Sequence, residues 1–332
     1  EADMHYVCGF SPSEGMILVT PTAVYQLVDS RYTETARLHA ADTGVQVTEI
    51  TTGFWDELDA RLAKIDCKIL LFEDRTIAYR QYTQLQGIFS GELRPVGNGV
   101  MDLRNVKEPW EIDLMKTANR IAEKAFLELL NDVKPGKTEK ELSARFDYLL
   151  AQGGSDGVSF DTILLPGANT SMPHGVPENR EVQKGDFVLF DFGATYRGYH
   201  SDMTRTVAVG SATAEMQAAY DLVLRAQLAG IQALQAGVPC KEVYQAAYDV
   251  LAAEDKAQYF RHSLGHGVGL EIHEGYNASP RSEDVYQTGN VTSVEPGIYL
   301  PDKFGIRIED VLYLSPHGRE NLSNVTKKLI VL

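Results

Sequence analysis

Alternating apolar and polar stretches in the first third of the chain predict a small domain of strands and helices. Period-two and continuous apolar runs indicate strands, whereas apolar positions three to four residues apart indicate helices. Because the two kinds of element alternate, we expect an α/β domain over residues 1–98. Residues 4–10 read as the interior of a domain, so a leading strand and helix are expected to be missing. Strands are expected at 16–20, 23–28 and 68–72, the last of them buried, and helices at 32–41 and 55–64.

A Gly-Asn-Gly tripeptide at 97–99 marks a candidate domain boundary, and helical periodicity resumes after it. A long helix is expected to begin at Pro109, which suits a first helical turn, and to end near Leu130. Thr138 and Glu141 have the spacing of a capping box, so a second helix is expected to begin there.

The second domain, expected over residues 99–332, contains a weak internal repeat. The motif around Gly136 resembles the motif around Gly237, and each copy has a long helix before it and a shorter helix and strands after it. The repeat is too long for a solenoid. It predicts one α+β domain of two similar α-α-β-β halves related by a pseudo-two-fold axis.

Each half carries a pair of acids on a predicted hairpin. Asp191 and Asp202 lie symmetrically about the first turn, and Glu295 and Glu309 lie symmetrically about the second. Residues so placed face each other across an antiparallel pair, where like charges are destabilising. A single such acid would more simply be a surface residue or the ion-pair partner of an arginine. Two pairs in equivalent halves predict a shared metal site, with His266 of a Gly-rich run as a fifth ligand.

Four carboxylates and one imidazole suit two divalent metal ions. The oxygen-rich set favours manganese, with zinc, cobalt or iron as alternatives. The net charge of −15, from 31 basic and 46 acidic residues, argues against nucleic acid or an anionic membrane surface as partner. No apolar run approaches the ~20 residues of a membrane span, and no signal peptide opens the chain. The three cysteines are scattered, so we expect neither a disulfide framework nor a zinc motif, and a cytoplasmic location.

The motifs around these acids resemble those of the Xaa-Pro peptidase family, which includes prolidase and aminopeptidase P. The resemblance rests on residues 189–194, 199–206, 263–269, 293–297 and 305–310, and it extends over nearly the whole chain. It implies an N-terminal creatinase-like domain followed by a catalytic domain with the pita-bread fold.

The resemblance also implies a role for each matching residue. Asp191 would bind one metal ion, His266 and Glu295 the other, and Asp202 and Glu309 would bridge both. A hydroxide bridging the ions would attack the scissile carbonyl, and Glu295 would move its proton to the leaving nitrogen.

Further residues match positions that handle the substrate in this family. His273 is expected to stabilise the oxyanion, with His174 as a second catalytic candidate. For the two aromatic residues among the remaining candidates, packing in the core is an equally good interpretation. The candidates for substrate binding are His174, His262, Arg307, Tyr299 and Phe160.

The residues alone indicate a metallohydrolase, and the resemblance implies an Xaa-Pro dipeptidase or Xaa-Pro aminopeptidase. Its substrates would be small peptides with proline in second position, and homodimers are usual in the family. Two alternatives are another hydrolase on this fold, such as a creatinase-like amidinohydrolase, and a non-catalytic binding protein. The complete ligand set argues against both, because creatinases lack it and binding proteins on this fold typically lose ligands.

Overall fold

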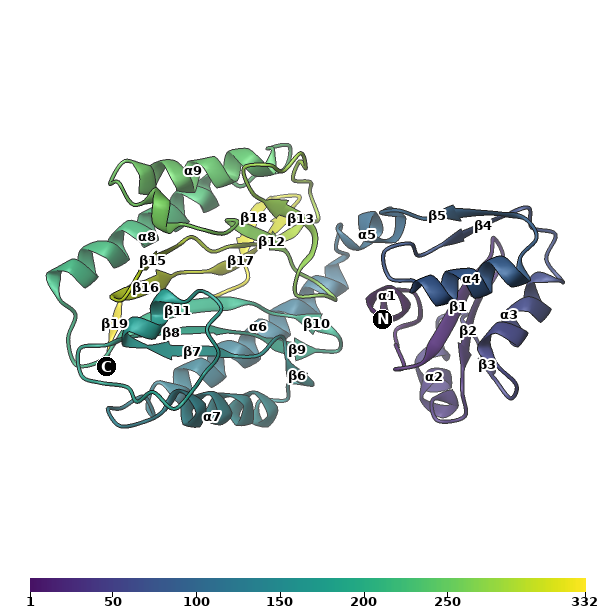
Figure 1. The fold of residues 1–332 in the computed structure, drawn as a ribbon, viewed down its shortest axis with the longest axis horizontal. Helices are drawn as coiled ribbons and strands as arrows, with labels where there is room; N and C mark the ends of the chain where they lie inside the picture. Colours follow the sequence, from purple (N-terminus) through teal and green to yellow (C-terminus); the bar gives the residue numbers. More distant parts are fainter. The chain divides into compact units, whose positions relative to one another are not determined.

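All residues, 1–332, are described by the computed structural model, and they form two compact units, Glu1–Arg104 and Asn105–Leu332 (Figure 1). The first unit has the alternation of strands and helices expected from the sequence. The second holds every candidate site residue. None of the helices combines the length and the apolar character needed to cross a membrane.

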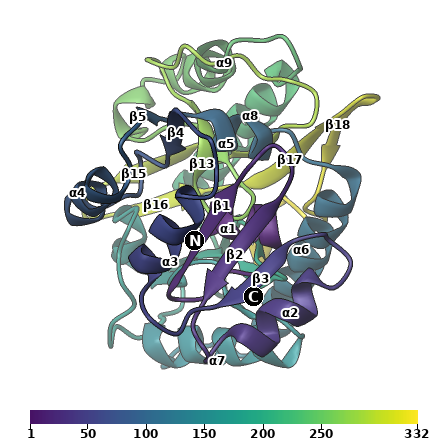
Figure 2. The same cartoon turned by 90° about the vertical axis from the view of Figure 1, so that its right-hand side faces the viewer.

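The first unit contains a three-stranded sheet, a separate parallel strand pair and five helices. Its elements are α1 (Ala2–Cys8), β1 (Gly15–Val19), β2 (Val24–Val28), α2 (Thr33–Ala40), β3 (Gln46–Glu49), α3 (Phe54–Leu62), β4 (Ile69–Phe72), α4 (Tyr79–Ile88), β5 (Glu92–Pro95) and α5 (Gly99–Arg104). β2 runs antiparallel to β1 and parallel to β3, and Figure 2 shows the three strands side by side. Leu18 of β1 packs with Leu58, Leu62 and Leu85 in the core beneath them.

The strands and helices expected in this unit are confirmed, with small shifts at their ends. The expectation of a buried strand at 68–72 is wrong in part, because Ile69 and Leu71 are 41% and 57% exposed. β4 pairs only with β5 and turns a single face to the core. The boundary expected at 97–99 differs from the observed division, since α5 packs against α1 and Arg104 donates to Asp3.

The second unit places its strands between two pairs of helices (Figure 1). The first half comprises α6 (Pro109–Leu129), α7 (Glu139–Gln152), β6 (Gly157–Val158), β7 (Ile163–Pro166), η1 (Gly167–Ser171), β8 (Phe187–Phe192), β9 (Ala194–Tyr196), β10 (Tyr199–His200) and β11 (Met203–Ala208). The second half comprises α8 (Ala214–Ala233), α9 (Cys240–Ala252), η2 (Ala257–Tyr259), β12 (Gly265–Gly267), β13 (Glu274–Ala278), β14 (Val291–Val294), β15 (Gly297–Leu300), β16 (Phe304–Arg307), β17 (Asp310–Ser315), β18 (Gly318–Asn321) and β19 (Ile330–Val331). The main sheets have the orders β19-β11-β8-β7 and β13-β12-β14-β17-β18.

The internal repeat has a structural counterpart at its two glycines. Gly136 and Gly237 have φ angles of 90° and 89°, in the left-handed region that glycine adopts without strain. The Gly136 N–H donates to Val182 O, and the Gly237 N–H donates to Tyr286 O. Each contact ties the start of a helix to the chain just before a later strand of the same half, β8 in the first and β14 in the second. The two halves share the α-α-β-β order that was expected.

The helix starts also follow the sequence. α6 begins at Pro109, as predicted. The Thr138 side chain accepts from the Glu141 N–H at 3.2 Å, and the Glu141 carboxylate accepts from the Thr138 N–H at 2.9 Å. This reciprocal pair is the predicted capping box, and it fixes the first turn of α7.

The register expected for the first hairpin is wrong by two residues. Asp191 lies opposite Thr204, not Asp202, in the antiparallel pair of β8 and β11. The cause is a tight turn at Arg197 and Gly198, whose positive φ angles of 49° and 81° allow a two-residue connection. Because side chains two residues apart point to the same face of a strand, Asp202 and Asp191 still share one side of the hairpin.

The second hairpin has the expected register. Val294 lies opposite Asp310 and Gly297 lies opposite Arg307, in two ladders with one continuous register. Glu295 and Glu309 are the next residues along from the first of these pairs, so they face each other where the two ladders meet. The acids therefore sit in a break between β14 and β15, beside the sheet that carries β12.

Candidate metal centre

Three buried side chains from both halves of the second unit converge on one point. One oxygen each of Asp202 and Glu309 and one ring nitrogen of His266 all lie within 4.8 Å of one another. The His266 Nε2 atom is 3.5 Å from Asp202 Oδ2 and 3.3 Å from Glu295 Oε1. Asp202 follows β10, His266 lies on β12, and Glu309 precedes β17. Elements distant in the sequence thus supply one cluster of carboxylate and imidazole groups.

Two carboxylate oxygens in this cluster have no hydrogen-bond donor. They are Oδ1 of Asp191 and Oε1 of Glu309, both inaccessible to solvent. An ionised carboxylate oxygen buried without a donor is costly, and a cation is the partner that would remove that cost. The donor set is also right for divalent ions that prefer oxygen with some imidazole. The residues present therefore fit a metal centre.

The electrostatics of the cluster support the same reading. Burial raises the pKa of Asp202 and of Glu309 well above the usual carboxyl range, and the surrounding carboxylates raise both further. Burial also opposes ionisation of Glu295, but the hydrogen bond and charge of His266 outweigh it and lower the pKa of Glu295 to about 2. Burial lowers the pKa of His266, yet Glu295 outweighs burial and leaves that pKa raised. The raised pKa values mean that Asp202, Glu309 and His266 hold protons more readily without metal, and divalent ions would displace those protons on binding.

The tautomer of His266 is set by its own strand. Its Nδ1–H donates to the Gly267 carbonyl at 3.1 Å, which leaves Nε2 directed at Asp202 and Glu295. A metal-ligating histidine commonly has its other ring nitrogen held in this way. The ring is thus presented with the nitrogen that a metal ion would need.

Arg307 donates hydrogen bonds to three side chains of the site. Its Nη2 donates to Asp191 Oδ2 at 2.5 Å, and its Nη1 donates to the Tyr299 hydroxyl at 2.6 Å. Its Nε donates to Thr204 Oγ1 at 3.1 Å, and the guanidinium is almost wholly buried. The arginine therefore supports Asp191, whereas sequence reasoning assigned it to the substrate.

Tyr299 and His262 continue this chain of contacts. The Nδ1–H of His262 donates to the Ser263 carbonyl, so Nε2 accepts from the Tyr299 hydroxyl at 2.9 Å. Burial lowers the pKa of His262 and raises the pKa of Tyr299 to about 12. Tyr299 therefore acts as a polar connector between Arg307 and His262, not as plain core packing.

The other predicted histidines lie at the exposed side of the cluster. The His273 ring meets the His266 ring edge-on at an interplanar angle of 71°, with centroids 4.0 Å apart. Burial, then the charge of His266, lowers the pKa of His273. His174 is exposed, and its charge also acts on His262 and His273. The charge interactions of His174 with both His262 and His273 place the three side chains close to one another.

Phe160 and His200 lie on or beside the first hairpin. Phe160 is half-buried and follows Ser159, whose hydroxyl donates to Ala194 O beside the first hairpin. His200, two residues before Asp202, turns its Nδ1 toward Thr195 Oγ1 at 3.4 Å, so it faces the neighbouring strand.

Sequence reasoning missed two hydroxyl residues that orient the acids. Thr204 Oγ1 donates to Glu309 Oε2 at 2.7 Å and accepts from Arg307. Ser293 Oγ donates to Glu295 Oε1 at 3.1 Å and accepts the backbone N–H of His266. Thr204 of β11 lies two residues after Asp202, and Ser293 of β14 lies two residues before Glu295, in extended chain. That spacing puts both on the ligand face and could have identified them.

Comparison with known proteins finds two matching family models, described as Metallopeptidase family M24 over residues 113–316 and Creatinase/Prolidase N-terminal domain over residues 1–106. The structure of an Xaa-Pro dipeptidase from Bacillus anthracis superposes with a TM-score of 0.96 and 35% identity, over 100% of this chain and 93% of that one. An X-Pro aminopeptidase from Thermotoga maritima MSB8 gives 0.94 and 34%, over 100% and 94%. An Xaa-Pro dipeptidase from Pyrococcus horikoshii is 37% identical over 72% of this chain and 68% of its own length.

Proposed function

The chain belongs to metallopeptidase family M24, and from that membership we propose that it uses two divalent ions to hydrolyse the peptide bond before proline in small peptides. The observation that carries the proposal is the convergence of Asp202, His266 and Glu309 beside buried carboxylate oxygens without donors. The oxygen-rich donor set favours manganese. Homodimer formation and a cytoplasmic location stay predictions.

In this proposal Asp191 would hold one ion, His266 and Glu295 would hold the other, and Asp202 and Glu309 would be shared by the two. Divalent ions held there would supply the Lewis acidity that makes a water molecule nucleophilic at neutral pH and polarises a carbonyl. Glu295 is held in place by Ser293 and His266 at 3.1 and 3.3 Å. From that position it accepts the proton of the attacking water and passes it to the leaving nitrogen.

Recognition of proline falls to the residues on the exposed side of the cluster. The leaving nitrogen of an Xaa-Pro bond carries no hydrogen, so selectivity has to come from the ring and the carboxylate. His273 would donate a hydrogen bond to the developing oxyanion, and His174 would contact the proline carboxylate. His262 would line the site with its ring, because Ser263 O and the Tyr299 hydroxyl occupy its two nitrogens. Arg307 and Tyr299 contribute indirectly, because Arg307 holds Asp191 and Tyr299 holds His262 by hydrogen bonds.

The test compares an Xaa-Pro dipeptide with an Xaa-Pro-Yaa tripeptide and an Xaa-Ala dipeptide. Chelated protein is assayed alone and after addition of Mn²⁺, Zn²⁺ or Co²⁺. We expect hydrolysis of proline substrates that depends on metal and is lost in Glu295→Gln. The ratio of dipeptide to tripeptide rates separates the two activities that the related proteins' names carry. Metal-independent hydrolysis, or equal rates on the Xaa-Ala dipeptide, would contradict the proposal.

A further inference from the structure

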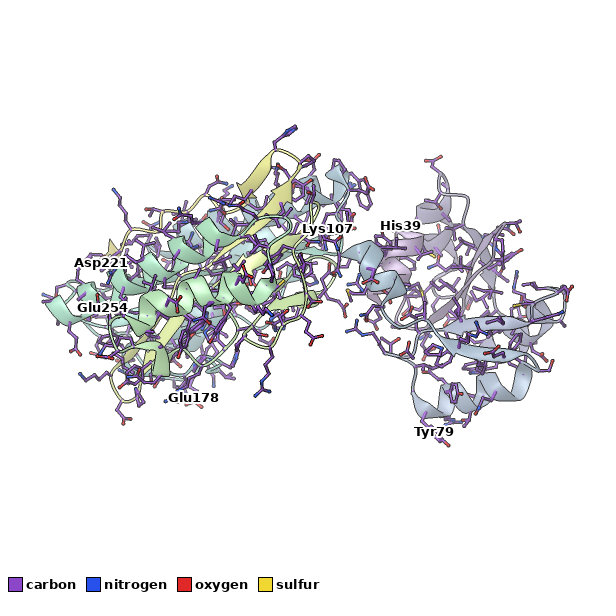
Figure 3. All side chains as sticks on the ribbon, turned by 90° about the horizontal axis from the view of Figure 1, so that it is seen from above. His39, Tyr79, Lys107, Glu178, Asp221 and Glu254 are labelled. Carbon is purple, nitrogen blue, oxygen red and sulfur yellow. The ribbon has the colours of Figure 1, made fainter.

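The second unit contains a buried ion pair that the proposed chemistry does not use. Lys107 Nζ contacts Glu274 Oε1, and their side chains are only 2% and 1% exposed (Lys107 is labelled in Figure 3). The two residues are 167 positions apart in the sequence. The desolvation of two buried charges offsets much of their mutual attraction, so such a pair by itself contributes little net stability.

Glu274 lies at the end of the turn that connects β12, which carries His266, to β13. It lies opposite Gly267 where the register of β12 and β13 shifts, and its Oε2 accepts from the Glu271 N–H at 3.2 Å. The turn is tight because Gly269 has no side chain. A Cβ atom there would lie 2.1 Å from Glu274 Oε1, so the carboxylate fills the interior of the turn.

Lys107 approaches this turn from a fixed piece of backbone. Its N–H donates to Gly289 O at 2.9 Å, and the Asn290 side chain donates to Asn105 O at 2.8 Å. On the other side, the His200 N–H donates to Gly269 O at 2.9 Å. The turn is thus held from outside by two separate segments, and Lys107 supplies a charged contact to the Glu274 carboxylate.

We propose that the Lys107–Glu274 pair is a positioning element that sets the imidazole of His273 over the metal centre. His273 directly precedes Glu274, and its ring stands edge-on against His266 with centroids 4.0 Å apart. Rotation of Glu274 out of the turn would carry His273 with it. This inference rests on the proposed function, in which His273 donates to the oxyanion, and it adds Lys107 and Glu274 as residues that act through His273.

The test is a double-mutant cycle on kcat for an Xaa-Pro dipeptide with metal-loaded protein. His273→Ala is expected to lower kcat about 10²–10³-fold, as removal of an oxyanion donor does. Lys107→Met is expected to lower kcat about 10- to 100-fold, as loss of a supporting contact does, with KM and metal content near those of the unaltered protein. In the His273→Ala background, Lys107→Met should have almost no further effect, because its route to the reaction is gone.

Lys107→Arg keeps the charge and should restore most of the kcat lost in Lys107→Met. If Lys107→Met does not fold, the neutral pair Lys107→Met with Glu274→Gln takes its place, since it leaves no unpaired buried charge. Lys116→Met removes the lysine of the half-exposed Lys116–Glu320 pair, and it should leave kcat unchanged.

Four outcomes would overturn the inference, and they are distinguishable. Equal effects of Lys107→Met with and without His273 would mean that the pair acts elsewhere. An unchanged kcat in Lys107→Met would mean that it positions nothing. Loss of metal in Lys107→Met would point to His266 instead. A normal kcat in His273→Ala would remove the oxyanion role itself, and with it the reason to position that ring.

Discussion

At the scale of single residues, Tyr299 links Arg307, which holds the candidate ligand Asp191, to His262. Its hydroxyl accepts from Arg307 and donates to His262, at 2.6 and 2.9 Å. Tyr299→Phe leaves both partners short of a hydrogen bond, a cost of about 1–3 kcal/mol for buried groups. We expect kcat/KM on an Xaa-Pro dipeptide to fall about 10- to 100-fold, with metal content unchanged.

Tyr220→Phe is the matched control for that measurement. Tyr220 is equally buried, and its hydroxyl donates to Lys327 O in the core around α8. We expect the control to lower the free energy of unfolding without changing kcat/KM. If Tyr299→Phe behaves like the control, Tyr299 is a core residue and not a connector.

Metal content distinguishes the two kinds of carboxylate proposed for the centre. Two like charges 4 Å apart repel by ~4 kcal/mol at an effective dielectric constant of 20, so each buried acid matters to the ion beside it. Glu309→Gln replaces a carboxylate that we assign to both ions and should cost both. Asp191→Asn should weaken mainly one. The check is metal bound per chain, with circular dichroism to show that each variant is folded. Two tightly held ions in Glu309→Gln would rule out the shared role of Glu309.

At the scale of elements, the hairpin of β8 and β11 has no room for a side chain at Gly193. A Cβ atom there would lie 1.9 Å from the backbone oxygen of Ser201, which precedes Asp202. Gly193→Ala must therefore push the strands apart and displace Asp202. We expect the chelated protein to lose about 1–3 kcal/mol in urea unfolding, and metal affinity to fall as well.

Gly157→Ala is the control, because a Cβ atom at Gly157 has nothing within 4 Å. It should leave metal affinity as it was. Equal metal affinity in the two variants would show that the close approach at Gly193 does not position Asp202.

At the scale of the whole molecule, the acids of the centre make folding depend on pH when metal is removed. Burial and mutual repulsion raise the pKa of Asp202 and Glu309 in the folded chain above the unfolded values. The folded chain then binds more protons than the unfolded chain between those pKa values, so stability falls as pH rises through that window. We expect chelated protein to melt at a higher temperature at pH 6 than at pH 8.

Metal should reverse that dependence, since ions replace the protons and bind more tightly as the ligands ionise. Chelated protein with both Asp202→Asn and Glu309→Gln should show a smaller difference in melting temperature between the two pH values. The check is thermal unfolding, at both pH values, of the chelated protein, the metal-loaded protein and the chelated double variant. A chelated protein that is more stable at pH 8 would contradict it.

Local features of this chain were determined by the sequence alone. The capping box of Thr138 and Glu141 formed as predicted, because its partners are three residues apart and a helix brings them together. Glu295 and Glu309 faced each other as expected, because strand alternation and a short turn set the register of a hairpin. The positive φ angles of Gly136 and Gly237 agree with a repeat that was visible in the letters.

Tertiary structure decided everything that depends on distant neighbours. The turn at Arg197 and Gly198 gave the first hairpin a register two residues away from the expected one. The sequence of this turn is compatible with both registers, so it could not decide between them. The hydrogen bonds of Arg307 to Asp191 and Tyr299 exist only because the fold brings these distant residues together. Lys107 and Glu274 carry no mutual signal, because a buried ion pair across 167 residues is created only when the fold desolvates both charges together.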